Sequence, residues 1–141
     1  MNQIVNQINI LSDLAEHVEA LEMRGKSLSE DWYQFKAGQP ADVQELFDVS
    51  VQSLNLLGQL AQALSERLSG GSPTDPERSK LQYAYNLTQE LIQSREANLE
   101  LLNHILQGNS LQEYLRALSL KENAAAKQAM TLRETIHAVI Q

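Results

Sequence analysis

The chain has 141 residues, a formal net charge of −7 and no cysteine, which excludes a disulfide framework and any cysteine metal site. Its acidic surplus makes duplex nucleic acid and anionic membrane poor partners. No apolar run reaches the ~18 residues of a membrane span, and residues 1–18 contain no basic residue, unlike a signal peptide, so we expect a cytoplasmic protein without membrane insertion.

Low contents of glycine, proline and phenylalanine, against many Leu, Gln, Ala and Glu, favour helix over sheet. The length suits a single core. We therefore expect one all-helical domain over residues 1–141.

The first expected helix covers residues 2–23. Arg24 followed by Gly25 predicts its end, because glycine often follows a basic last turn. Residues 29–38 then form a short second piece, which ends before Pro40. The first helix has apolar residues at alternating spacings of four and three, namely Ile4, Ile8, Leu11, Ala15 and Val18.

Pro40 opens the next helix, since proline suits a first helical turn. Residues 69–76, with two Gly and two Pro, predict a loop that places the flanking helices side by side and antiparallel. The helix before this loop carries the most regular apolar ladder of the chain: Val43, Phe47, Ser50, Leu54, Leu57, Ala61, Leu64 and Leu68.

Residues 77–107 form the helix around which the other helices are expected to pack. Its seam contains two polar residues, Ser94 and Asn98, and such residues specify register at some cost in stability. The full seam is Ala84, Leu87, Leu91, Ser94, Asn98, Leu101 and Ile105. From both ladders, the residues expected to form the core seam are Leu54, Leu57, Leu91, Asn98 and Leu101.

A last ladder follows a break at residues 108–110. Its middle is weak because Glu122 and the alanines at 124–126 offer little apolar area. We expect residues 2–107 to form the core and residues 110–141 an amphipathic region that docks loosely or only with a partner; the alternative is an ordinary last helix. The ladder is Leu111, Leu115, Leu118, Glu122, Ala125, Ala129, Leu132, Ile136 and Val139.

Together these helices predict an all-α fold, either an antiparallel helical bundle or an extended helical hairpin with long coiled-coil-like helices.

The histidines, His17, His104 and His137, lie on three different expected helices, where a lone His is more often structural or solvated than catalytic. Glu134 and His137 have di-iron spacing, but such a site needs two such pairs. We expect no enzyme activity, no cofactor and no metal.

Residues 104–110, HILQGNS, resemble the His-x-Leu-Lys-Gly-x-Ser signature of histidine phosphotransfer domains, which are also four-helix bundles. Gln107 stands where that family has a Lys that helps to neutralise the phosphoryl group. An alternative function is therefore phosphotransfer through His104.

Two stretches, residues 35–40 (FKAGQP) and 98–103 (NLELLN), stand before and within Leu-rich helices. Over roughly residues 28–118 the chain resembles the small acidic chaperones of flagellar type III export, the FlgN-like family with FliT as a relative. One departure is that no Tyr is followed by Gly, so the Tyr-Gly motif of several members is missing and their contact with the export gate is not implied.

The resemblance implies a non-enzymatic chaperone that binds a flagellar hook-associated or filament-cap protein and brings it to the export apparatus. Client binding would fall on a mobile C-terminal region. Another alternative is a structural adaptor that self-associates, for example as a homodimer. By position, the implied client-binding residues are Leu111, Leu115, Leu118, Leu132 and Ile136.

Overall fold

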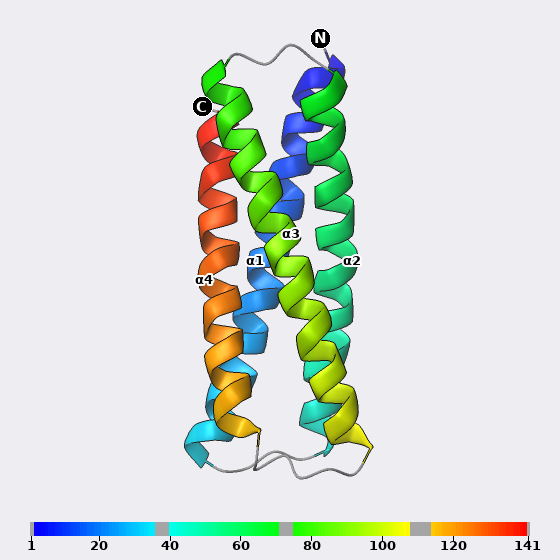
Figure 1. The fold of residues 1–141 in the computed structure, drawn as a ribbon, viewed down its shortest axis with the longest axis vertical. Helices are drawn as coiled ribbons and strands as arrows, with labels where there is room; N and C mark the ends of the chain where they lie inside the picture. Colours follow the sequence, from blue (N-terminus) through cyan, green and yellow to red (C-terminus); the bar gives the residue numbers. More distant parts are fainter. Residues whose placement is uncertain (1, 36–39, 71–74, 108–113, 141) are drawn as a thin grey trace.

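A computed structural model describes residues 2–35, 40–70, 75–107 and 114–140 of the chain. They form four long helices and, within these ranges, no strand (Figure 1). The expected all-α helical bundle is confirmed. The helices are α1 (Asn2–Phe35), α2 (Pro40–Gly70), α3 (Asp75–Leu106) and α4 (Leu115–Ile140).

Successive helices run antiparallel and enclose a common core (Figure 1). α1 and α3 each pack against both α2 and α4, so α1 lies diagonally across from α3. The predicted antiparallel pairing of the 43–68 and 84–105 ladders is confirmed by the contact of α2 with α3. The two termini of the chain lie at the same end of the bundle.

The expected end of the first helix at Gly25 is wrong, because α1 continues without interruption to Phe35. Gly25 is buried inside the helix, and a Cβ at this position would overlap the carboxylate of Glu122 on α4. The glycine therefore provides space for a neighbouring side chain and does not stop the helix. The short second piece expected at residues 29–38 is the last part of α1 as far as Phe35, and residues 36–38 lie outside the described ranges.

The other expected boundaries lie close to those of the structure. α2 begins at Pro40, as predicted, and extends to Gly70, while α3 begins at Asp75. The loop is thus shorter than the predicted residues 69–76. α3 ends at Leu106, just before the expected break, and the expected start of the last ladder at Leu111 lies outside the described residues.

Two separate apolar clusters fill the bundle. The large cluster lies in the half that holds the chain termini and includes Leu57 and Leu91. The small cluster lies in the other half and consists of Leu28, Val43, Leu46, Leu102, Ile105 and Leu118. On every helix the buried residues between the two clusters are polar, apart from Gly25 on α1, so the apolar core is interrupted near mid-length.

The inward face of α3 differs from the predicted seam. Leu91 and Asn98 are buried, but Ser94 is exposed and Arg95 points inward in its place. Each helix of a four-helix bundle touches two neighbours, so its buried stripe is wider than the seam of a two-stranded coiled coil. Leu54 and Leu101 are half-buried at the edge of this stripe.

Candidate functional site: a charged layer in the bundle core

A layer of polar side chains crosses the bundle between the two apolar clusters. All four helices contribute to it, and none of its side chains is more than 2% exposed. Charged groups are almost never this deeply buried unless they are paired. The residues of this charged layer are Glu22 on α1, Ser50 and Ser53 on α2, Arg95 and Asn98 on α3, and Glu122 on α4.

Arg95 is the centre of the charged layer. Its Nη2 donates to Oε2 of Glu22, and its Nη1 donates to Oε2 of Glu122 over 2.6 Å and to Oγ of Ser50 over 3.1 Å. One guanidinium on α3 therefore holds groups from each of the other three helices. Planar guanidinium groups suit this role because they present several donors in fixed directions.

Two further hydrogen bonds complete the charged layer. Ser53 Oγ donates to Oε1 of Glu22 over 2.6 Å, and Asn98 Nδ2 donates to Oε2 of Glu122 over 2.7 Å. Arg95 Nε and Glu122 Oε1 are buried without a hydrogen-bond partner among the described residues. The network is therefore incompletely satisfied, both at the guanidinium in its centre and at the carboxylate on α4.

The charged layer contains two carboxyl groups and one guanidinium. Burial raises the pKa of the Glu22 carboxyl, the nearby charge of Arg95 and the hydrogen bond from Ser53 lower it, and the net effect is a raised pKa. For Arg95, burial lowers the pKa, but the charges of Glu122 and Glu22 outweigh this and raise it, so the guanidinium stays charged. With both carboxyls ionised the core carries one uncompensated negative charge, which disfavours the ionised form of Glu22.

Glu22→Gln should make the bundle at least as stable as the unsubstituted chain at pH 7. The pKa of Glu22 is raised in the folded state above its ordinary value of 4.5. Such a carboxyl stabilises the fold fully at a pH below 4.5, and this stabilisation is lost as the pH rises through the folded-state pKa. Gln mimics the protonated carboxyl. Its amide oxygen can accept from Arg95, and its NH2 group can donate to the Ser53 hydroxyl, so both contacts of Glu22 are kept. Urea unfolding of both proteins from pH 4 to 8 checks this: a growing advantage of the variant at higher pH is expected, and an equal loss at every pH would contradict it.

Gly25 of α1 forms a notch for the α4 carboxylate. A methyl group there would overlap Glu122 Oε1 and lie 3.3 Å from Leu46 Cδ1. The carboxylate cannot move aside freely because Arg95 and Asn98 hold its other oxygen. The notch is thus part of the charged layer, although it carries no polar side chain.

Gly25→Ala should therefore destabilise the bundle by about 1–3 kcal/mol, the usual cost of overpacking a filled site. The matched control is Gly58→Ala on α2, where an added Cβ meets nothing within 4 Å. There the higher helix propensity of alanine should stabilise by about 1 kcal/mol. Thermal and urea unfolding measure both, and equal stabilisation by the two substitutions would show that the notch is not filled.

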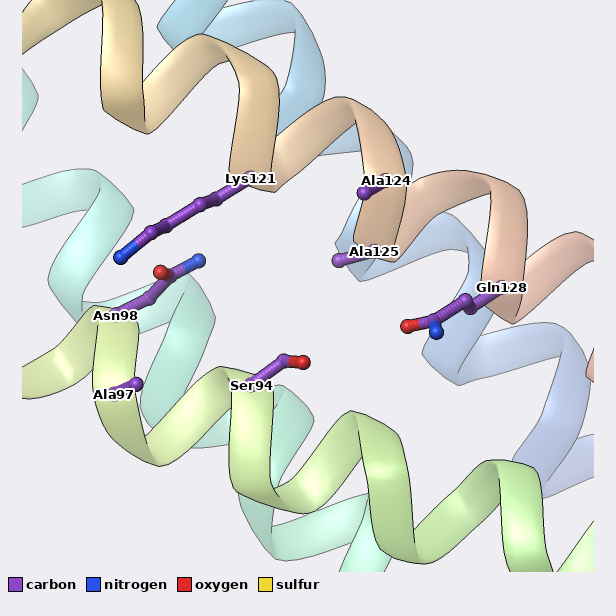
Figure 2. A pocket seen from close by; sticks show the side chains of 7 residues that line it. All are labelled: Ser94, Ala97, Asn98, Lys121, Ala124, Ala125 and Gln128. Carbon is purple, nitrogen blue, oxygen red and sulfur yellow. The ribbon is translucent and has the colours of Figure 1, made fainter.

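α4 is held beside the charged layer by small side chains. Ala125, Ala126 and Ala129 are buried on its inward face, and each lacks three carbons of a leucine, at about 0.8 kcal/mol of burial per carbon. A pocket of about 240 Å³ remains between α3 and α4. Figure 2 shows its lining residues, Ser94, Ala97, Asn98, Lys121, Ala124, Ala125 and Gln128.

Along its outer edge α4 is tied to α1 by polar contacts. Ser12 Oγ and Glu16 Oε1 lie 3.0 and 3.1 Å from His137 Nε2, and Arg133 Nε donates to Oε2 of Glu19 over 2.7 Å. The four charged or ionisable side chains among them are between a quarter and about half exposed. Partly exposed pairs of this kind stabilise by at most about 1 kcal/mol each, so they guide the docking of α4 more than they fix it.

The residues predicted to bind a client do not form a surface in this structure. Leu118, Leu132 and Ile136 are almost completely buried, the first in the small cluster and the other two in the large one. Leu111 lies outside the described residues, as does the side chain of Leu115, the first residue of α4. A client could reach the buried three only if α4 left its place.

The histidines remain apart, on α1, α3 and α4. His17 and His104 are exposed, and the ring of His104 meets that of Tyr114 edge-on at a centroid distance of 5.8 Å. Within the described residues no three His, Asp or Glu side chains are grouped so that they could hold a metal ion. None of the described helix segments is both long and apolar enough to cross a membrane.

Sequence reasoning placed Asn98 on the core seam and Glu122 on the last ladder but missed their partners. Arg95 follows Leu91 by four residues, and Glu22 follows Val18 by four, so each continues an inward-facing series. Opposite charges at inward-facing positions of two different helices are therefore the sequence signal that could have indicated the ion pair.

Comparisons with protein-family models, with curated proteins and with solved structures each find no match, so the function must be inferred from the bundle itself.

Proposed function

We propose that this protein is a non-enzymatic cytoplasmic chaperone of the flagellar type III export kind. In this proposal it binds a helix of a hook-associated, filament-cap or similar secreted protein and keeps it available for the export apparatus. The client occupies the face of the bundle that α4 covers. Binding therefore requires α4 to move away from α1 and α3.

The observation that carries the proposal is the composition of the inward face of α4. At mid-length this helix buries a carboxylate and three alanines, Ala125, Ala126 and Ala129, where a stably docked helix would bury large apolar residues. The pocket between α3 and α4 opens at the same level. A helix attached in this way should open at a lower free energy than its neighbours.

The contacts of the buried carboxylate hold α4 less firmly than their short distances suggest. Transfer of Glu122 into the core removed its hydration, and much of that cost is recovered when the side chain returns to water. Arg95 keeps its ion pair with Glu22 after α4 has left. Opening therefore exposes one charge that water solvates well and leaves a balanced pair behind.

A cross-link between α4 and α1 tests the proposal. The chain has no cysteine, so Ser12→Cys with His137→Cys would react only at these two positions, whose side chains are in contact. Bridging both cysteines with a short bismaleimide should abolish co-elution with hook-associated and filament-cap proteins on size exclusion.

The matched control is the same double variant with each cysteine capped separately by N-ethylmaleimide, which should bind the client. If the bridged protein binds the client as tightly as the capped one, the client does not need the face beneath α4. If neither form binds any of these proteins, the export assignment is wrong.

The phosphotransfer alternative has a simple test of its own. Incubation with acetyl phosphate should leave the intact mass unchanged, because the proposal gives His104 no chemical role. A mass increase of one phosphoryl group that His104→Gln removes would favour phosphotransfer over the chaperone proposal.

A further inference from the structure

The charged layer constrains which helix can replace α4. When α4 leaves, Arg95 Nη1 keeps Ser50 but loses the carboxylate of Glu122, and Asn98 Nδ2 loses the same carboxylate as its acceptor. Both side chains are nearly fully buried beneath α4. A helix that covers them again must offer an acceptor at this level or leave buried donors without partners.

The notch at Gly25 adds a condition of shape. In the closed bundle Glu122 Oε1 occupies the space that a Cβ at Gly25 would need. A short side chain in the replacing helix would leave this space empty, and a cation there would face the guanidinium of Arg95. An extended carboxylate satisfies the donors and fills the notch together.

We infer that the client helix carries a glutamate that takes the place of Glu122, bound by Arg95 and Asn98 and seated against Gly25. This inference rests on the proposed function. The inward face of α4 shows which residues we expect around this glutamate in the client helix. Small residues should follow it at three, four and seven positions. Large apolar residues should stand four positions before it and ten and fourteen positions after it. In α4 these positions are Ala125, Ala126, Ala129, Leu118, Leu132 and Ile136.

A peptide with the sequence of residues 115–140 serves as the probe, labelled with fluorescein at its N-terminus and titrated with the full-length protein. Fluorescence anisotropy should show saturable binding, at a rate that levels off at high protein concentration because α4 must open first. The Glu122→Leu peptide should bind roughly tenfold more weakly or worse, because it removes the acceptor that Glu122 supplies to the buried donors Arg95 Nη1 and Asn98 Nδ2. The control peptide, Lys127→Ala at an exposed position, should bind like the unsubstituted one.

Two results overturn the inference, and they are distinguishable. If the Glu122→Leu peptide binds as tightly as the unsubstituted peptide, the charged layer does not select a carboxylate, although displacement of α4 stands. If no peptide binds, α4 is not displaced, and the proposed function fails together with the inference.

Discussion

Arg95→Ala should destabilise the bundle by about 3–5 kcal/mol, the usual cost of removing one partner from a buried ion pair. The substitution leaves Glu22 and Glu122 facing each other in the core without a counter-charge, and both side chains are fully buried. Urea unfolding at pH 7 measures the loss. The loss should shrink as the pH falls, because a protonated carboxyl needs no counter-charge.

The matched control removes the whole charged set with Glu22→Leu, Arg95→Met and Glu122→Leu. Replacing a complete buried ion network by apolar residues is often neutral or stabilising, so this triple variant should recover most of the loss. If Arg95→Ala alone stays within about 1 kcal/mol of the unsubstituted protein, the guanidinium does not hold the layer together.

Leu91→Ala should cost about 2–5 kcal/mol, because the side chain is 1% exposed in the large cluster and its removal leaves a cavity. The matched control is Leu120→Ala on α4, where the leucine is 62% exposed and the change should stay within about 0.5 kcal/mol. Thermal and urea unfolding compare the two. Equal effects would mean that Leu91 is not a filled core position.

The fold could be predicted from the sequence because its main signals are local. The alternating three and four spacings of apolar residues on α2 and α3 determine both helices, and the short loop between them determines their antiparallel contact. Pro40 marks the start of α2 by its own backbone geometry. Each of these features can be recognised without knowledge of a neighbouring helix.

The charged layer could not be predicted because it depends on contacts between distant parts of the chain. Arg95 looks like a solvated residue until Glu22 and Glu122, both more than twenty residues away in sequence, are placed beside it. Gly25 resembles a helix stop for the same reason, since its purpose becomes visible only with the α4 carboxylate in place. Packing between helices overrode the local preference at these positions.

In the proposed mechanism α4 opens separately from the rest of the bundle. Native-state hydrogen exchange on the full-length protein tests it directly, by comparing the free energy of opening of amides at 125–136 on α4 with that at 87–98 on α3. We expect the slowest amides of α4 to open well below the free energy of global unfolding, whereas those of α3 open only with it. Exchange of α4 as slow as that of α3 would show that α4 is a permanent part of the core and would contradict its separate opening.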